Sequence, residues 1–392
     1  MNQLQRFSWT DGNRYELLLN GECFFPDILA AIARAQNYIF IELYLFESGR
    51  VADEFIEALQ LAAGRDVQIH LLLDDYGSLG LNKDDRYRLA QPPFQLVYYN
   101  PLSSHSTLRN LHRILWHRVG YDLHRDHRKL ILIDGEIAYV GGLGITDEFY
   151  SSNELEASWR ENAIKVEGPV VVDWFRLFKQ AWEQYASIPL SLTQPKPVIM
   201  EDGGYARVAF SEGERHNDIN RQLRKRLSSA EHRIWLCTAY FLPSWRFRRK
   251  LRYAARKDLD VRLLLPGPHT DHPIVRHAGR RHYYRLLQNG VRIFEYQPRV
   301  LHAKSLLCDN WVTLGSINFD HWGLNWNLEA NIEVDDYRFA QQVQQMFEQD
   351  FADSVEITRE TWHHRTVYER LAAWFWGKID KLVIAVTSRL RR

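Results

Sequence analysis

The sequence predicts an α/β protein made of two copies of one layered domain. The pattern His-x-Lys-x4-Asp occurs twice, at 127–134 and at 302–309. Apolar, strand-like runs alternate with amphipathic helices in the same order before each copy. The residues that follow each copy also correspond, because segment 159–166 aligns with segment 327–334. We therefore expect two duplicated domains that pack about a pseudo-twofold axis.

The first half shows the strand and helix signals of this arrangement. A helix is expected to open at Pro26, because the missing N–H of proline costs nothing in the first turn of a helix. Continuous apolar runs at 39–46 and 67–74 indicate strands that are covered on both faces. Segment 94–99 predicts a third strand, the first motif supplies a fourth, and a helix is predicted over 170–185.

The second half repeats this order after a proline-rich segment, 187–197, which is the best linker candidate in the chain. Its predicted elements are a helix over 217–229, a strand over 233–240, a helix opened by Pro243, a strand over 261–265, a helix over 273–289 and a strand over 291–296. The predicted organisation is a first domain at 1–187, a linker at 188–204, a second domain at 205–358 and a tail at 359–392.

Two segments fall outside the repeat. The first half carries an insert at about 101–126, in which Leu108, Leu111 and Leu115 form a helical stripe. This insert is either an ordinary surface helix or an interfacial helix beside the active site. The tail at 359–392 combines an apolar stripe with Trp, Phe, Lys and Arg, which is typical of a helix lying in a membrane interface. The alternative is a helix that docks on its own domain.

Composition narrows the class of protein. The chain of 392 residues has a formal net charge of +1, which argues against a dedicated nucleic-acid binder. Its three cysteines are too few for a disulfide framework and favour a reducing compartment. We expect neither a signal peptide nor a spanning helix, because no apolar run has the required length. A basic cluster between residues 246 and 285 is either a solvated helix face or a surface for anionic lipid.

The two motifs present the same pair of side chains. On a strand, residues two apart point to one face, so His127 and Lys129 project together, as do His302 and Lys304. Two imidazoles and two ammonium groups in one pocket make little sense as structure, because like charges repel and their burial is costly. Around a phosphodiester they are favourable, because the lysines neutralise its charge. The sequence therefore predicts a phosphodiester site between the two halves.

These motifs resemble those of the phospholipase D superfamily, whose members carry two copies of His-x-Lys-x4-Asp. The resemblance implies two phospholipase D-like αβα sandwich domains with the active site at their interface. It also implies that one histidine attacks phosphorus while the other protonates the leaving group and then deprotonates the incoming alcohol or water. The resemblance favours His127 as nucleophile and His302 as acid and base, although the residues alone do not decide between them. No metal or other cofactor is implied.

The resemblance also implies roles for the other motif residues. Lys129, Lys304 and Asn318 would hold the non-bridging phosphate oxygens, and Ser316 belongs to the same Gly-Ser-x-Asn pattern as Asn318. Glu161 and Glu329 match the downstream acids that orient each histidine. Asp134 and Asp309 complete the two motifs and are grouped with the catalytic residues. For these two aspartates the alternative interpretation, which we favour, is that they anchor the motif turn by hydrogen bonds.

Within the superfamily, the sequence is most similar to bacterial cardiolipin synthases of the short type that lacks N-terminal transmembrane helices. Segments 138–143, 159–161 and 238–243 carry this similarity. One departure is Gly144, which stands where the family usually has Asn after Gly-Gly. The first half is therefore expected to lack one phosphate donor.

The implied function is transphosphatidylation of phosphatidylglycerol, which gives cardiolipin and glycerol. The implied partner is an anionic phospholipid membrane, contacted peripherally on the cytoplasmic face of the bacterial inner membrane, and phosphatidylethanolamine is an alternative donor. No nucleic-acid partner is expected, and the sequence says nothing of protein partners. The alternatives are a hydrolytic phospholipase D, a nuclease of the same fold, or a non-catalytic membrane scaffold, which Gly144 makes conceivable.

Overall fold

The structure is a computed structural model that describes residues 6–101, 124–150, 158–213, 216–320, 326–365 and 375–376. Its first half alternates strands and helices as predicted. The elements are β1 (Thr10–Leu19), α1 (Asn20–Arg34), β2 (Tyr38–Leu43), α2 (Arg50–Ala63), β3 (Gln68–Asp74), α3 (Lys83–Ala90), β4 (Phe94–Tyr99), β5 (Lys129–Ile133), β6 (Ile137–Gly141), β7 (Asn162–Glu167) and α6 (Val170–Tyr185).

The second half repeats this order and adds a strand and a short helix at its end. Its elements are β8 (Gly204–Glu212), β9 (His216–Asn217), α7 (Asp218–Ser229), β10 (Arg233–Cys237), α8 (Trp245–Ala255), β11 (Asp260–Pro266), α9 (Pro273–Arg280), α10 (Tyr283–Leu287), β12 (Arg292–Tyr296), β13 (Ser305–Cys308), β14 (Trp311–Gly315), β15 (Leu328–Asp335), α12 (Tyr337–Ala352), β16 (Ser354–Ile357) and α13 (Arg359–His363).

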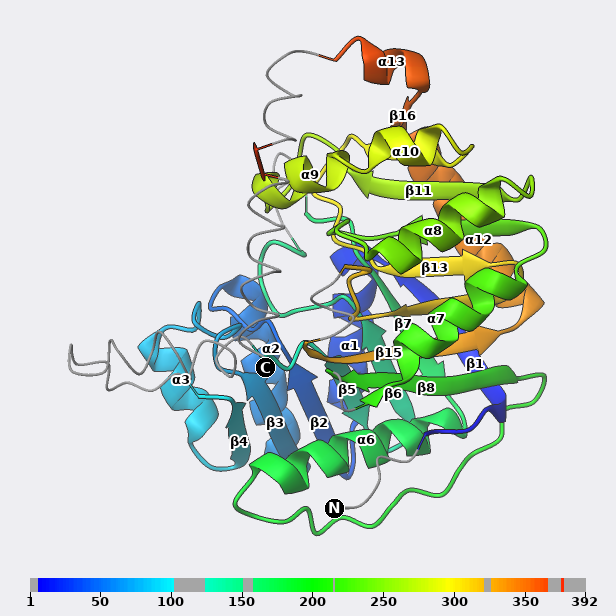
Figure 1. The fold of residues 1–392 in the computed structure, drawn as a ribbon. Coiled ribbons are helices and arrows are strands. Elements are labelled where there is room, and N and C mark those ends of the chain that lie inside the picture. The colour runs from blue at the N-terminus through cyan, green and yellow to red at the C-terminus, as the bar shows by residue number, and fades with distance from the viewer. Residues whose placement is uncertain are drawn as a thin grey trace, which may run out of the picture.

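One sheet of 16 strands runs through both halves (Figure 1). From β1 outward the order is β7-β6-β5-β2-β3-β4, and from β8 outward it is β15-β14-β13-β10-β11-β12-β16. The halves join where β1 runs antiparallel to β8, with Thr10 opposite Ala206 and Asn13 opposite Gly204. Equivalent strands thus occupy equivalent places on either side of the junction, and the predicted duplicated α/β architecture is confirmed.

Helices cover both faces of each half. In the first half, Ile39 and Ile41 of β2 point to the core formed with α1 and α2. Phe40 of the same strand points to the opposite core, which contains Trp174 and Phe178 of α6. In the second half, α7, α8 and α10 cover one face, and α12 covers the other. The motif strands are therefore enclosed on both sides, as their continuous apolar sequence predicts.

The start of α1 differs from the prediction. The helix begins at Asn20, and Pro26 lies inside it, so the expectation that Pro26 opens the helix was wrong. Asn20 has a φ of 62°, which turns the chain sharply out of β1 and into the helix. Pro26 removes one helical hydrogen bond, but the buried side chains of Phe24 and Ile28 hold this part of the helix against the sheet.

Several predictions fall on other parts of the chain. The helical stripe of the insert, which includes Leu108 and Leu111, lies outside the described residues, and so does most of the tail beyond residue 365. Residues 186–203 contain no helix or strand, and their role as a linker stays a prediction. In the described part of the chain, no helix combines the length and apolar character needed to cross a bilayer.

Candidate active site

Each motif enters the site by pairing with the other half of the molecule. The backbone N–H of His127 donates to the carbonyl of Leu328, at the start of β15, over 2.9 Å. In the same way, the N–H of His302 donates to the carbonyl of Arg160, just before β7, over 2.8 Å. Both histidines lie in extended segments immediately before their strands, β5 and β13. This exchange between the halves brings the two motifs to one place.

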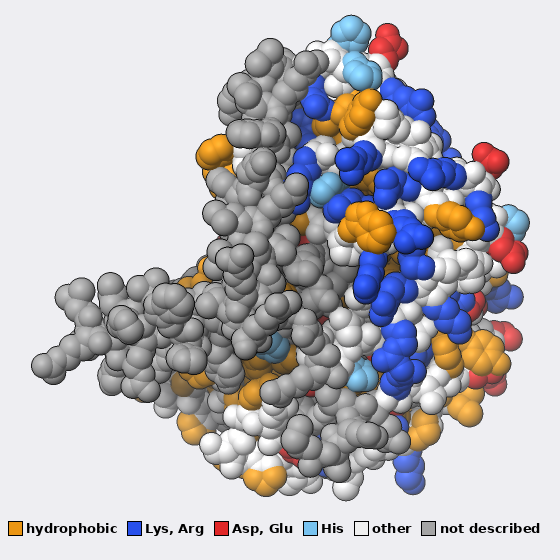
Figure 2. Space-filling model, viewed as in Figure 1, with side chains coloured by type: hydrophobic (Ala, Val, Ile, Leu, Met, Phe, Trp, Pro, Cys, Tyr) orange, Lys and Arg blue, Asp and Glu red, His pale blue; other side chains and the backbone are white. Residues whose placement is uncertain are grey.

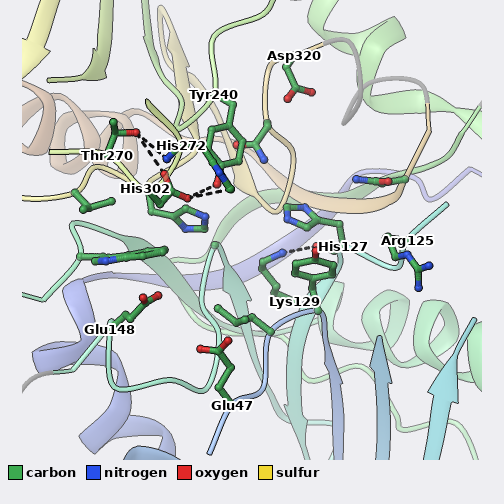
Figure 3. A pocket seen from close by; sticks show the side chains of 18 residues that line it. Glu47, Arg125, His127, Lys129, Glu148, Tyr240, Thr270, His272, His302 and Asp320 are labelled. Atoms are coloured by element: carbon green, nitrogen blue, oxygen red, sulfur yellow. Dashed lines mark hydrogen bonds and ion pairs between the residues drawn. The ribbon is translucent and has the colours of Figure 1, made fainter. Parts of the chain in front are cut away.

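A cavity of about 760 Å³ lies where the motifs meet. Figure 3 shows the imidazoles of His127 and His302 pointing toward one another across it, with Lys129 beside His127. Lys304 is fully buried behind His302. The other lining residues are Tyr44, Leu45, Glu47, Arg125, Gly142, Glu148, Trp159, Tyr240, Thr270, Asp271, His272, Val300, Asn318, Asp320 and Asn327.

A buried glutamate of the opposite half holds each histidine. Nδ1 of His127 lies 3.0 Å from Oε2 of Glu329, and Nδ1 of His302 lies 2.6 Å from Oε2 of Glu161. Both glutamates are 0% exposed. A carboxylate on Nδ1 fixes the orientation of the ring, so Nε2 is the ring nitrogen without a carboxylate partner. The sequence identified both glutamates, but not that each serves the histidine of the other half.

The two glutamates are supported differently. The hydroxyl of Ser316 donates to Oε2 of Glu329 and accepts from the N–H of Ala330 at 3.0 Å. Ser316 therefore positions the carboxylate that holds His127. At the equivalent place in the first half stands Gly142, where a Cβ would lie only 2.2 Å from Oε2 of Glu161. Glu161 thus fills the space that a side chain at Gly142 would need.

The lysines lie against their own histidines. Nζ of Lys129 donates to the carbonyl of His127 over 2.7 Å. Nζ of Lys304 lies 2.9 Å from Nδ1 and 3.1 Å from Nε2 of His302, and it is also 3.7 Å from the carboxylate of Glu161. The ammonium of Lys129 therefore lies at the backbone of His127 and lines the cavity, whereas that of Lys304 lies against the ring of His302 and is fully buried.

Asp134 and Asp309 do not line the cavity. The carboxylate of Asp134 accepts three backbone N–H groups, those of residues 36, 37 and 38 at the start of β2, over 2.7–2.9 Å. Asp309 accepts the corresponding three, those of residues 231, 232 and 233 at the start of β10, over 2.9–3.0 Å. Their grouping with the catalytic residues is therefore corrected, and the alternative interpretation as turn anchors describes their contacts.

The amide position after the glycine pair differs between the halves. Asn318 lines the cavity, and its buried Oδ1 has no hydrogen-bond partner among the described residues. In the first half the equivalent residue is Gly144, which packs so closely on Leu45 that a Cβ would lie 2.9 Å from the Cβ of Leu45. The cavity wall on this side is thus the apolar side chain of Leu45, and only the second half supplies an amide.

The protonation of the first motif is shifted by burial. Burial lowers the pKa of His127 well below its usual range, and the nearby charges of Lys129 and Lys304 lower it further. Burial also lowers the pKa of Lys129 to about 7, although the carboxylate of Glu329 partly opposes this. Burial raises the pKa of Glu329 well above its usual range. We expect a neutral imidazole at His127, which is the form that can act as a nucleophile.

In the second motif, burial and nearby charges shift the pKa values in a different balance. Burial and the charge of Lys304 lower the pKa of His302, but the hydrogen bond to Glu161 opposes them. For Glu161, burial alone would raise the pKa, but Lys304 and the hydrogen bond from His302 outweigh it and lower the pKa. An ionised carboxylate therefore faces His302, and this charge favours the imidazolium form. The pKa of His302 is thus lowered overall, but with an opposing carboxylate, whereas the pKa of His127 is lowered well below its usual range.

Aromatic side chains around the histidines were not predicted as site residues. The ring of Tyr44 lies 4.9 Å from that of His127, and the ring of Trp159 lies 5.2 Å from that of His302. Tyr44 follows β2 and Tyr240 follows β10, so both occupy the carboxyl end of a parallel strand. Ligand sites of α/β sheets gather at such ends, and this rule could have located both tyrosines from the sequence.

Known proteins share this sequence and fold. The family described as "Cardiolipin synthase, PLD-like domain" matches residues 28–182 and 223–351. Cardiolipin synthase B of Escherichia coli (strain K12) is 35% identical over 340 residues, which cover 85% of this chain and 79% of the relative. A probable cardiolipin synthase of Bacillus subtilis (strain 168) is 28% identical over 359 residues, covering 91% and 69% of the two chains.

A solved structure supports the fold at much lower sequence similarity. The phosphatidylserine synthase of Haemophilus influenzae Rd KW20 superposes with a TM-score of 0.69 at 12% identity, covering 99% of this chain and 97% of the other. Together with the two motif histidines that line one cavity, these matches place the chain among the phospholipase D-type enzymes. The chain belongs to the cardiolipin synthase family with phospholipase D-like domains, a family of phosphatidyltransferases.

Proposed function

We propose that the protein makes cardiolipin by transferring a phosphatidyl group between two molecules of phosphatidylglycerol. The observation that carries this proposal is the pair of imidazoles, one from each half, that face one cavity with Nδ1 fixed by a buried glutamate. The identity of 35% to Cardiolipin synthase B of Escherichia coli supports the substrate class.

In the first step, Nε2 of His127 attacks the phosphorus of phosphatidylglycerol. The N–P bond forms while the bond from phosphorus to the glycerol oxygen breaks, and the leaving glycerol takes a proton from Nε2 of His302. The ionised carboxylate of Glu161 supports this assignment, because it favours the protonated form of His302 before the step. The product is a phosphatidyl group attached covalently to His127.

In the second step, a headgroup hydroxyl of another phosphatidylglycerol replaces the glycerol. His302, now neutral, takes the proton of this hydroxyl while its oxygen attacks phosphorus and the N–P bond breaks. His127 returns to the free imidazole, and cardiolipin leaves. Water at the same position would give phosphatidic acid, so the ratio of transfer to hydrolysis depends on which acceptor fills the cavity.

Three further groups would stabilise the negative charge on the non-bridging phosphate oxygens in both steps. Lys129 and Lys304 flank the two imidazoles and would neutralise the non-bridging oxygens. The amide of Asn318 faces the cavity and would donate to one of these oxygens. Because Gly144 supplies no equivalent group, we expect the phosphate to lie closer to the second half of the molecule.

The test is product analysis of the purified protein with phosphatidylglycerol that carries a labelled headgroup glycerol. We expect labelled free glycerol and one cardiolipin for each glycerol released. We expect His127→Ala and His302→Ala each to abolish both products. A covalent lipid adduct should accumulate in the absence of acceptor and disappear in the His127→Ala variant. Phosphatidic acid as the main product would instead assign hydrolysis, and full turnover by either histidine variant would refute the mechanism.

We further propose that the protein acts at the surface of an anionic phospholipid membrane, on the cytoplasmic face. The proposed substrates reside in the bilayer, so the cavity must reach the headgroup layer. Sedimentation of the full chain with phosphatidylglycerol vesicles tests this location, and failure to bind them at low salt would refute it.

A further inference from the structure

One face of the second half carries an unbalanced positive charge. Six cations on α7, α8, α10 and the turn after α8 are exposed, and we call them the basic face: Arg224, Arg246, Arg249, Arg256, Lys257 and Arg285. Helix α8 packs beside both α7 and α10, so these residues form one continuous surface. Figure 2 shows this band of Lys and Arg side chains, interrupted by apolar ones, over the helices of the second half.

Few acidic side chains lie near the basic face, and Asp258 is the exposed one in the turn after α8, next to Lys257. Among helices α7 to α10 the single acidic residue is Asp218, which is 1% exposed and bonded to Arg207. None of the six cations forms an ion pair with a carboxylate in the described part of the chain. Partial burial lowers the pKa of Lys250, and the nearby charges of Arg224 and Arg249 lower it further. Positive charges of this surface thus act on one another.

The duplicated fold provides an internal comparison. Helix α2 occupies in the first half the place that α8 occupies in the second, since each follows the strand paired with the motif strand. Helix α2 has one Arg and three acidic residues, whereas α8 has five basic residues and no acidic one. Both helices pack against their sheets through the same kind of apolar face. The positive charge of α8 is therefore not a requirement of the fold.

Aromatic side chains lie among these cations. On α8, Trp245 is 55% exposed and Tyr253 is 58% exposed. The guanidinium of Arg249 lies 5.3 Å from the ring centre of Trp245, and Nζ of Lys257 lies 4.7 Å from that of Tyr253. Exposed aromatic rings mixed with Lys and Arg are typical of surfaces that lie at the headgroup level of a bilayer.

The basic face also continues to the mouth of the active site. Helix α8 starts shortly after Tyr240, and α9 starts directly after His272, and both of these residues line the cavity. Ile274, in the first turn of α9, is 50% exposed. A flat surface that covers the N-terminal ends of α8 and α9 would therefore reach the rim of the cavity.

We propose that the basic face is the surface by which this protein docks on an anionic phospholipid bilayer, with Trp245 and Ile274 entering the headgroup layer beside the cavity. Its purpose rests on the proposed function, because docking would bring lipid headgroups to the two histidines. Positive charge complements the anionic surface, and the aromatic side chains distinguish this face from one that binds only the phosphates of a nucleic acid.

The test compares two full-length triple variants with equal loss of charge. The first is Arg246→Gln, Arg249→Gln and Lys257→Gln on the basic face. The matched control is Arg34→Gln, Lys83→Gln and Lys196→Gln, three exposed cations elsewhere. Each basic residue near an anionic membrane contributes about fivefold to partitioning, so the first variant should lose about a hundredfold in affinity for vesicles of phosphatidylglycerol and phosphatidylcholine. The control should stay within threefold of the unmodified protein.

A second variant separates apolar insertion from charge. Trp245→Ala should weaken the binding to these vesicles that persists in high salt, because salt screens the charges but not the insertion of the ring. Vesicle binding is measured without turnover. The docking proposal can therefore fail while cardiolipin synthesis is observed, and docking can be observed while cardiolipin synthesis is not. Equal losses in both triple variants, or none in the first, would overturn the proposal. Tighter binding to duplex DNA than to the vesicles at the same salt concentration would also overturn the proposal, provided that the first triple variant lost this DNA binding.

Discussion

The contact between Glu161 and His302 provides a test of the division of labour between the histidines. In the variant Glu161→Gln, an amide replaces the carboxylate that lies 2.6 Å from Nδ1 of His302. A hydrogen bond to a charged group contributes about 1.5–3 kcal/mol, and 1.36 kcal/mol corresponds to a tenfold change, so kcat should fall about 10- to 150-fold. The protonated form of His302 is the form that loses this stabilisation.

The pH dependence of Glu161→Gln tests the direction in which Glu161 shifts the pKa of His302. Burial and the charge of Lys304 lower the pKa of His302, and the ionised carboxylate of Glu161 limits this fall. Its removal should therefore lower this pKa further. In the proposed mechanism His302 acts first as a protonated acid, so the rate should fall as the pH rises through its pKa. The alkaline limb of the kcat profile should then move to lower pH in Glu161→Gln.

The assay is the release of labelled glycerol from phosphatidylglycerol vesicles, measured across the pH range together with the rate of adduct formation on His127. The matched control is Glu148→Gln, which removes a carboxylate from the same cavity that bonds neither histidine in the described structure. This control should keep its alkaline limb. Activity of Glu161→Gln within threefold of the unmodified protein, with an unshifted limb, would refute the role given to Glu161.

Three further predictions follow from the site. Burial lowers the pKa of Lys129 to about 7, so the free enzyme should lose this positive charge as the pH rises through 7, and kcat/KM should fall there. The variant Lys129→Met should lose this pH dependence together with most of the activity. Asp309→Ala loses three hydrogen bonds to backbone N–H groups, so thermal unfolding should show a loss of about 2 kcal/mol while kcat at low temperature changes little. In Gly142→Ser the new Cβ would lie 2.2 Å from Glu161, so turnover should fall more than tenfold although Ser316 is the natural residue at the equivalent place.

Much of the site could be predicted from the sequence because its chemistry lies in short, repeated patterns. The His-Lys pairs were identified from spacing alone, and the glutamates from the alignment of the two halves. The crossed pairing of Glu161 with His302 and of Glu329 with His127 was not predicted. Local patterns specify what a strand carries, but not which strand of the other half it meets.

The strands at the junction were missed for a physical reason. No strand was predicted over β1 or β8, although these two join the halves. β1 mixes buried and exposed residues without regular alternation, and it contains Asn13, whose buried amide donates to the carbonyl of Gly204 over 3.1 Å. A strand held partly by polar contacts to a distant partner lacks the apolar period that a single sequence displays.

The crossed glutamates have a consequence for how such a protein can evolve. Neither half contains a complete catalytic pair, because His127 depends on Glu329 and His302 depends on Glu161. A change that shifts one histidine must be matched by a change in the other copy of the duplicated segment. The outer helices α2 and α8 differ in charge, one acidic and the other basic, whereas each copy keeps the histidine and the glutamate of the crossed pairs. Duplication here produced one indivisible site from two similar pieces.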